Sequence, residues 1–471
     1  MSWALIFAPA LLAVELPDIG NPADAAISPQ EEQRIGENFM RNLRRSVALV
    51  SDPEVHEYIN SLGYRLVSNS EQQDGAFTFF VVEDPAINAF AVPGGFIGIN
   101  SGLILASTSE GELASVLAHE IAHVTQRHIA RAVNRSSNMN LPATAALIAA
   151  IILGARSGQA GEVGQAAVMA TVAGTTQASI NFTRANEQEA DRLGIQTLAR
   201  SGFDPRYMPL FFERLQQASR YYKSDMPEFL RTHPITINRI ADSRGRAEQY
   251  PRPEKSDLIS DYLLIHAKLQ TRYDQEALSR FKIALQGRAG PQQDAARYGY
   301  VLTLRHAGNY DEARKQLAIL LKKDPQRIAY RIAAAKTEQI AGNSAEALRI
   351  YRDAFNISPH NMPITVHYGE ALLEAGEAEQ ARQILAELTQ RHDHEPSIYQ
   401  LLARSETESG HPVDAHQSLA EYYYLSGETR AAIDQLEIAL QLAGDGARYQ
   451  TARIEDKLVQ LRHESETEEE H

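Results

Sequence analysis

The segment VLAHEIAHVTQRH, residues 116–128, places two histidines four positions apart, with a glutamate directly after the first. Each residue of an α-helix turns about 100° around the axis, so His119 and His123 are expected to share one face. Both imidazoles can then reach one metal ion, and Glu120 lies beside them, where it can hold a water molecule. The alternative is a helix face whose polar residues have only structural partners.

A third histidine, His128, lies nine residues after His119. On a continuous helix this separation corresponds to about 180° of rotation. We therefore expect His128 to face away from the other two histidines, as a solvated or capping residue.

A second segment, TRANEQEADRLGI at residues 183–195, offers the missing ligand. A catalytic zinc site needs a third protein ligand and one open position for water. Glu187 and Asp191 are four positions apart on another predicted helix, whereas Glu189 points elsewhere. Glu187 is the candidate ligand, and Asp191 is the candidate acceptor of a hydrogen bond from a ligating imidazole. The alternative for Glu187 is an exposed carboxylate in a charged run.

The chain before the histidine motif alternates helical and strand signals. Ser28 is a predicted N-cap, followed by Pro29 at the first helical position and Glu31 completing a capping box; a second helix is expected around residues 52–67. Residues 77–104 then show aromatic and β-branched runs broken by Asp-Pro and Pro-Gly-Gly, which predicts two or three strands with tight turns. An exposed edge strand in this region would let an extended substrate bind by backbone pairing.

Beyond residue 255 the sequence is periodic. Glycines and alanines recur every 34 residues, and two prolines share the interval: Gly308, Gly342, Gly376 and Gly410; Ala313, Ala347, Ala381 and Ala415; Pro325 and Pro359. This is the tetratricopeptide pattern, in which we expect a small residue to let two antiparallel helices approach and proline to close the second helix. Degenerate flanking helices are expected from Tyr273 and from Tyr424. Such repeats stack into a curved solenoid with a concave binding face.

Three further segments carry predictions. Residues 1–14 include an apolar run too short to span a bilayer, which favours a signal peptide over a buried N-terminal strand or helix, although the first basic residue is Arg34. Residues 141–155 are strongly apolar and, with the weakly apolar residues 163–183, predict a buried helical hairpin; peripheral membrane contact is the alternative. The acidic tail, residues 463–471, is expected to be disordered.

The composition of the 471 residues limits the classes of function that the chain can have. The formal net charge of −14 argues against a general nucleic-acid-binding protein and is compatible with a cation or an unfolded polypeptide as partner. There are no cysteines, so a metal site must use His, Asp and Glu, and there are no disulfides. The composition therefore fits a location in the cytoplasm or the cell envelope.

Four motifs in this order resemble those of the HtpX/Ste24-type zinc peptidases: NAFAVPGGFIGINSGL, HEIAH, EQEAD and RTHPITINR, within residues 28–245. The resemblance implies one Zn²⁺ per chain bound by His119, His123 and Glu187, with Glu120 as general base. It also implies that His233 lies near the metal, where it either stabilises the transition state or caps the zinc. Arg239 could stabilise the oxyanion or form a salt bridge that holds the domain together.

With the repeats appended, the chain is similar to periplasmic members of that family. The resemblance implies an exported endopeptidase, soluble or peripheral to the membrane, that acts on misfolded or stalled outer-membrane proteins and assists their assembly. Its repeats would recruit β-barrel clients or their assembly machinery. The expected fold is mainly α, with an α+β zincin-like domain over residues 28–250 and an α-solenoid over residues 256–462. The alternative is a repeat scaffold or chaperone with a latent or structural zinc site.

Overall fold

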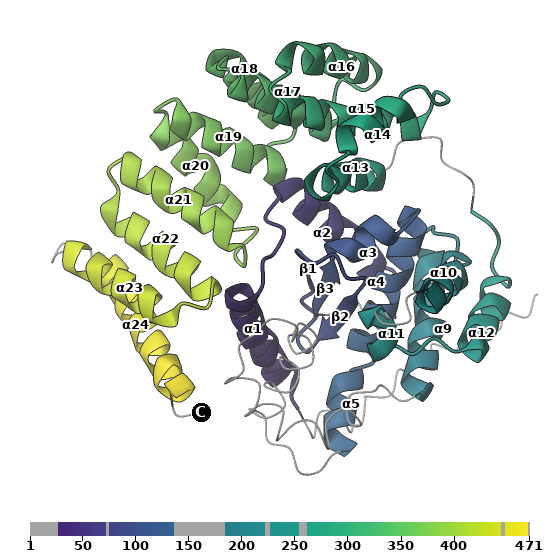
Figure 1. Ribbon diagram of the computed structural model, residues 1–471. Coiled ribbons are helices and arrows are strands. Elements are labelled where there is room, and N and C mark those ends of the chain that lie inside the picture. Colours follow the sequence, from purple (N-terminus) through teal and green to yellow (C-terminus); the bar gives the residue numbers. More distant parts are fainter. Residues whose placement is uncertain are drawn as a thin grey trace, which may run out of the picture.

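The computed structural model describes residues 27–71, 75–135, 184–221, 227–253, 261–443 and 448–469. Within these residues a small sheet with surrounding helices is followed by a long series of helices, which curves around it as an arc (Figure 1). The mainly α fold class is therefore confirmed. The predictions for residues 1–14, 141–155 and 163–183 fall outside the described residues.

Two N-terminal helices begin where the sequence predicts. Helix α1, Pro29–Ser46, has the capping box: the Ser28 hydroxyl accepts from the Glu31 amide at 3.2 Å, and the Glu31 carboxylate accepts from the Ser28 amide at 2.9 Å. Helix α2, Pro53–Val67, is capped by Asp52, whose carboxylate accepts from the first-turn amides. Local capping chemistry thus sets both starts.

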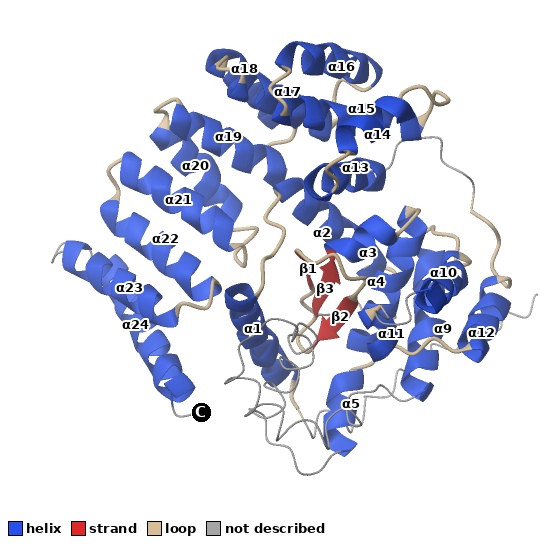
Figure 2. Cartoon of the chain, viewed as in Figure 1, coloured by secondary structure: helices blue, strands red, loops and turns tan. Residues whose placement is uncertain are grey.

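The sheet has three strands in the order β1-β3-β2 (Figure 2). Strand β1, Thr78–Val82, runs parallel to the central β3, Phe96–Asn100, and β2, Ala89–Val92, is antiparallel to β3. The Pro-Gly-Gly segment forms the turn between β2 and β3, where Gly94 and Gly95 have φ of +80° and +82°. Strand β2 is thereby left at an edge of the sheet.

The helices that follow the sheet carry the candidate metal-binding residues. They are α3, Ser101–Ala106; α4, Glu110–Thr125; α5, His128–Arg135; α9, Arg184–Arg200; α10, Tyr207–Tyr221; α11, Glu228–Thr232; and α12, Ile237–Ala247. Ser109 caps α4, where its hydroxyl accepts from the Glu112 amide. The main apolar core lies where α2, the sheet and α4 meet, and includes the fully buried Ile59, Phe79, Ile97 and Leu117.

The repeats form antiparallel helix pairs. Their helices are α13, Asp261–Tyr273; α14, Ala277–Ala284; α15, Pro291–His306; α16, Tyr310–Lys323; α17, Ile328–Ile340; α18, Ser344–Ile357; α19, Met362–Glu374; α20, Ala378–Thr389; α21, Pro396–Glu408; α22, Pro412–Leu425; α23, Thr429–Ala443; and α24, Arg448–Glu469. Pro325 and Pro359 each follow the end of a second helix by two residues, as expected.

The repeated glycines have a different role from the one that the pattern suggested. A Cβ at Gly308, Gly342, Gly376 or Gly410 would meet no atom within 4 Å, so these residues do not permit close helix contact. Each has a φ between +73° and +84°, the left-handed conformation that ends a helix and turns the chain. The repeated alanines make the close approach instead, since all four are at most 2% exposed.

The arc contacts the sheet-containing part through α1 and α2. The guanidinium of Arg41 donates to the Tyr424 hydroxyl at 2.6 Å, and Arg44 donates to the Leu425 carbonyl at 2.8 Å. On α2, Glu54 accepts from the Tyr298 hydroxyl at 3.3 Å. Two separate stretches of the arc are therefore held by the first two helices.

The prediction of a disordered acidic tail is wrong over the described residues. Helix α24 continues to Glu469. The carboxylate of Glu464 accepts from the Tyr424 hydroxyl at 3.0 Å and lies 3.7 Å from the Arg41 guanidinium. The run of acidic residues in this tail predicted disorder. Contacts with residues far away in the sequence stabilise the helix instead.

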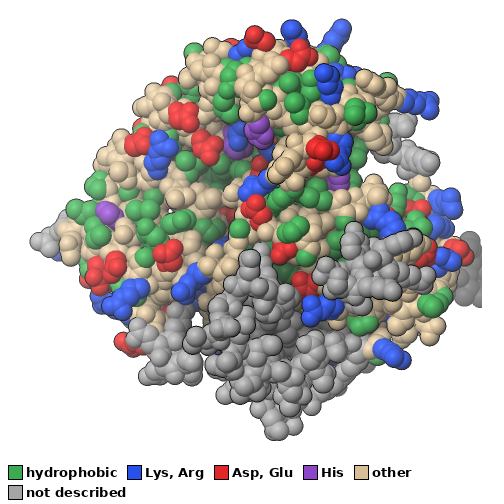
Figure 3. Space-filling view, in the orientation of Figure 1, with side chains coloured by type: hydrophobic (Ala, Val, Ile, Leu, Met, Phe, Trp, Pro, Cys, Tyr) green, Lys and Arg blue, Asp and Glu red, His purple; other side chains and the backbone are tan. Residues whose placement is uncertain are grey.

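Among the described residues, no helix combines the length and the apolar character needed to cross a bilayer. On the face shown in Figure 3, acidic and basic side chains are interspersed with apolar ones. The described part of this face therefore carries charges of both signs.

Candidate metal centre

Helix α4 carries the first three residues of the candidate site. His119 and His123 lie on one face, and Glu120 lies between them in sequence; the three side chains are at most 1% exposed. Helix α9 packs closely against this helix at Gly194. A Cβ at Gly194 would come within 3.3 Å of the His119 amide nitrogen, so a larger residue would push α9 away.

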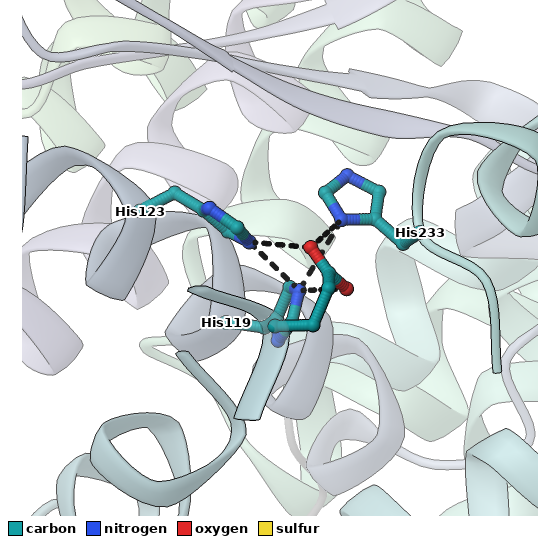
Figure 4. A group of neighbouring side chains, drawn as sticks. His119, His123 and His233 are labelled. Carbon is teal, nitrogen blue, oxygen red and sulfur yellow. Dashed lines mark hydrogen bonds and ion pairs between the residues drawn. The ribbon is translucent and has the colours of Figure 1, made fainter. Parts of the chain in front are cut away.

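Four buried side chains converge at one point (Figure 4). His119 and His123 come from α4, Glu187 from α9, and His233 from the end of α11. One ligand atom from each lies within 4.8 Å of all the others. The tertiary fold thus brings together residues that are up to 114 positions apart in the sequence.

The spacing of these donor atoms suits a small cation. Nε2 of His119 lies 3.0 Å from Nε2 of His123 and 3.4 Å from Nδ1 of His233. Oε1 of Glu187 lies 3.3 Å from Nε2 of His123 and 3.1 Å from Nδ1 of His233. Ligands at about 2.0–2.1 Å from a tetrahedral ion are about 3.4 Å apart. The donor set and its spacing therefore fit a metal ion held by nitrogen and oxygen.

A carboxylate faces the ring nitrogen of His119 that points away from the cluster. Its Nδ1 lies 3.0 Å from Oδ1 of Asp191, as the sequence led us to expect. Burial lowers the pKa of His119, but hydrogen bonds to Asp191 and Glu187 outweigh it and raise that pKa to about 9. A pocket that holds a proton this firmly is negative enough to attract a metal cation.

Arg239, from the first turn of α12, neutralises part of this negative charge. Its guanidinium donates two hydrogen bonds to the Asp191 carboxylate, each of 2.8 Å, and lies 2.7 Å from Oε2 of Glu187. All three side chains are buried. Burial lowers the pKa of Arg239, but the bonds to Asp191 and the two carboxylate charges raise it overall. These contacts favour the salt-bridge alternative for Arg239.

Glu120 lies on the side of the cluster that faces the sheet. Burial raises its pKa above the usual range, opposed by the charges of His233 and His119 and by the backbone amide of Ala91 in β2. Its Oε1 lies 3.5 Å from Nε2 of His233. A carboxyl with a raised pKa holds a proton more readily than a free glutamate, which suits a group that must accept a proton and later release it.

His233 follows the short helix α11 as its C-cap. Its ring stacks on Phe229, with centroids 4.8 Å apart and an interplanar angle of 28°. This stacking and the Nδ1 contact with Glu187 fix the ring so that Nδ1 faces the cluster while Nε2 faces Glu120.

The expectation that His128 faces away is wrong. Its side chain is fully buried, with Nδ1 2.8 Å from Nδ1 of His123 and Nε2 3.1 Å from Oε2 of Glu189. Burial lowers the pKa of His128 to about 4, although Glu189 opposes the change. His128 is thus a buried imidazole in direct contact with a candidate ligand.

The error has a physical cause. The rotation argument assumed one continuous helix, but α4 ends at Thr125 and Arg127 adopts a left-handed φ of +48°. Arg127 donates to the Ile27 carbonyl at 2.6 Å and to Glu32 at 3.1 Å. This turn returns the chain toward the cluster and places His128 beneath His123. The sequence carried no signal for a left-handed arginine, a rare conformation without glycine.

Known proteins resemble this chain in both of its parts. Residues 53–247 match the model of Peptidase family M48, and residues 275–337 and 340–405 match a tetratricopeptide repeat model. The putative beta-barrel assembly-enhancing protease of Vibrio cholerae is 44% identical over 314 residues, 66% of this chain and 64% of that protein. The beta-barrel assembly-enhancing protease of Escherichia coli (strain K12) is 44% identical over 309 residues, 65% of this chain and 62% of that protein.

A more distant relative is the mitochondrial metalloendopeptidase OMA1 of Schizosaccharomyces pombe. It is 30% identical over 183 residues, 39% of this chain and 50% of that protein. In each of these comparisons the chain spans less than two thirds of the relative's length. Residues 53–247 are therefore similar to peptidase family M48, and segments similar to tetratricopeptide repeats follow them along the chain.

Proposed function

We propose that this chain is a zinc-dependent endopeptidase. The observation that carries the proposal is the set of four buried nitrogen and oxygen donors at tetrahedral spacing. His119, His123 and Glu187 would hold one Zn²⁺ per chain, because imidazole and carboxylate ligands suit this ion. When bound, zinc supplies Lewis-acid polarisation of a peptide carbonyl and acidifies water.

Glu120 is the proposed general base. It would take the proton of the attacking water and deliver it to the leaving amine. Burial, which raises the pKa of this carboxyl, suits both transfers because it brings the pKa closer to neutral pH. The Ala91 amide beside Glu120 also places the edge strand β2 next to the reacting groups.

His233 has two proposed roles. As a fourth donor it would occupy the position that a catalytic water needs, and as a free imidazole it would stabilise the transition state. The separation of 3.1 Å between its Nδ1 and Glu187 supports the first role. We expect His233→Ala to raise proteolysis of an unfolded substrate severalfold. Unchanged or lower activity, with zinc still bound, would support the second role.

Asp191 and Arg239 are proposed to position the ligands. Asp191 would keep the proton of His119 on Nδ1, so that Nε2 offers its lone pair to the metal. Arg239 would hold both Asp191 and Glu187, and its two bonds to Asp191 support this role over direct oxyanion stabilisation.

The proposed substrates are unfolded or misfolded polypeptides. Strand β2 is an edge of the sheet and borders the cluster, so an extended segment could add to it by backbone hydrogen bonds without a strict sequence requirement. Cleavage of one defined sequence in folded proteins, and not of unfolded chains, would contradict this preference.

We further propose that the chain acts in the periplasm on outer-membrane β-barrel proteins, with the repeats recruiting these clients or their assembly machinery. The Vibrio cholerae and Escherichia coli relatives, both named as beta-barrel assembly-enhancing proteases, support this proposal. The alternative is a scaffold with a latent site, which the repeats favour because they present an extended binding surface.

A substrate trap distinguishes the two functions. The Glu120→Gln variant would keep the donor cluster and lose the base, so it should retain clients that the wild type cleaves and releases. Proteins that co-purify with each form from the cell envelope would be identified by mass spectrometry. Enrichment of β-barrel proteins on the variant alone supports the peptidase. The same partners on both proteins, with no cleavage products, would favour the scaffold.

A further inference from the structure

We propose that His128 is a positioning residue for His123, and that the left-handed turn at Arg127 exists to bring it there. This inference rests on the proposed zinc site, because it concerns how one of the proposed ligands is oriented. The spacing of the histidine motif predicted only a solvated or capping role for this third histidine.

The donor and acceptor of each hydrogen bond can be assigned in turn, starting at Glu189 and ending at His123. A carboxylate only accepts, so Nε2 of His128 must donate to Glu189 at 3.1 Å. A neutral imidazole has one donor and one acceptor, which makes Nδ1 of His128 the acceptor. The facing Nδ1 of His123, 2.8 Å away, must then be the donor. Its other nitrogen, Nε2, is left with the lone pair that faces the cluster.

Glu189 is itself held in place. Its Oε2 also accepts from the Arg131 guanidinium at 3.0 Å, one turn further along α5. The chain of contacts therefore runs from Arg131 through Glu189 and His128 to His123. It links helices α5, α9 and α4, so it fixes the orientation of the His123 ring with respect to the α9 helix that supplies Glu187.

The two candidate ligands on α4 are thus supported differently. Nδ1 of His119 faces a carboxylate directly, at 3.0 Å from Asp191, whereas Nδ1 of His123 faces the imidazole of His128, which in turn contacts Glu189. A strained residue is expected where the surrounding structure requires it. Arg127 has a φ of +48° and is held by Glu32 and the Ile27 carbonyl from the α1 region. Without this turn α4 would continue and His128 would point outward.

Two substitutions of His128 by amide side chains distinguish a role in orienting His123 from a role in filling space. In His128→Asn the amide oxygen can take the place of Nδ1 and accept from His123. In His128→Gln the amide lies where Nε2 was, so it reaches Glu189 and leaves His123 without this acceptor. Gln is the closer match in volume, so a purely structural role would favour Gln over Asn.

The affinity of the full chain for Zn²⁺ would be measured by competition with a chromophoric chelator. We expect His128→Asn to stay close to wild type and His128→Gln to bind roughly 10- to 100-fold more weakly, the usual effect of losing a partner of a metal-bound histidine. The visible absorption of the Co²⁺-loaded protein should change shape in His128→Gln and stay as in wild type in His128→Asn. His266→Asn, which alters a half-buried histidine bonded to the Leu105 carbonyl, is the matched control.

Equal affinities for the Asn and Gln variants, or tighter binding by Gln, would overturn the inference. The proposed zinc site is tested separately by wild type and His119→Ala. If wild type binds no stoichiometric zinc, or His119→Ala still binds it, the proposed function fails. If these two behave as expected while the two His128 variants do not differ in the stated order, only the positioning role is wrong.

Discussion

Two buried glutamates, one in the sheet-containing part of the molecule and one in the repeats, have pKa values shifted in opposite directions. Burial alone would raise the pKa of Glu187, but the charge of His233 and hydrogen bonds from three histidines hold it well below the usual range. Burial raises the pKa of Glu406, in α21, to about 7, because only a hydrogen bond from Ser418 and the more distant Arg382 oppose it. The first carboxylate therefore stays charged more readily than a free glutamate, whereas the second binds a proton more readily.

Ion pairs show the same contrast. Arg239 and Asp191 are 4% and 2% exposed in the cluster, whereas Arg349 and Glu346 in the repeats are 53% and 45% exposed. Separations in both pairs are below 3 Å. Water screens the second pair and not the first, so distance alone does not rank their importance.

The largest expected effect is therefore that of Arg239→Met. Removing one partner of a buried pair leaves uncompensated charge on Asp191 and Glu187, which costs about 3–5 kcal/mol in the free energy of unfolding. Arg349→Met, the control, should cost less than about 1 kcal/mol. Urea denaturation of both variants checks the difference, and equal losses would remove the contrast between the two regions.

Glu406 should make the stability of the chain depend on pH. Its folded-state pKa of about 7 lies above that of an unfolded glutamate, so the folded state binds the proton more tightly. This contribution is fully present below about pH 4 and is lost as pH rises through 7. Glu406→Gln should therefore be more stable than wild type at pH 8, by about 1–3 kcal/mol, with little difference at pH 4.

Thermal unfolding at the two pH values measures this effect. Glu408→Gln is the matched control, because Glu408 lies near the end of the same helix and pairs with Arg404 on the surface. A Glu406→Gln variant that loses stability equally at both pH values would mean that the carboxylate is charged in the fold.

The repeat glycines should tolerate substitution according to backbone conformation. Gly376 has a φ of +79° and open space where a Cβ would lie. Gly376→Ala should cost about 1–2 kcal/mol from the left-handed conformation alone. Gly376→Asn should cost less, since asparagine adopts this conformation more readily. Equal losses for Ala and Asn in urea denaturation would point to a steric cause instead.

The smallest expected effect is local. Arg41 contacts the Tyr424 ring and hydroxyl and lies near Glu464, so Arg41→Ala should free the end of α24 from α1. We expect faster hydrogen exchange over residues 460–469, at a cost of about 1 kcal/mol or less in global stability. Arg453→Ala, on the exposed side of the same helix, should leave that exchange unchanged. Unchanged exchange in Arg41→Ala would mean that other contacts hold the tail.

Much of the fold and of the site could be predicted from local pattern. The capping residues Ser28 and Asp52 lie where helices α1 and α2 were expected to begin, because a cap depends on residues within one turn. The 34-residue period predicted the helix pairs, since each repeat contacts mainly its neighbours. The four-residue spacing placed His119 and His123 on one face for the same local reason.

The features that could not be predicted correctly depended on residues far away in the sequence. The acidic tail is helical because Arg41 and Tyr424 meet it from far along the chain. The role of Arg239 could not be chosen until both of its carboxylate partners were known. Glu187 was a reasonable candidate only in combination with the histidine helix, and the fold supplies that combination.

The sequence by itself determined the helix starts, the repeat period and the residue types that could bind a metal, since each depends on neighbours within a few turns. Tertiary structure alone decided which donors meet, how Arg239 divides its bonds between two carboxylates, and that His128 turns inward beneath His123. The physical reason is that burial and long-range charge give each side chain its partners. A single left-handed residue, Arg127, was enough to reverse the direction that the helical period predicted.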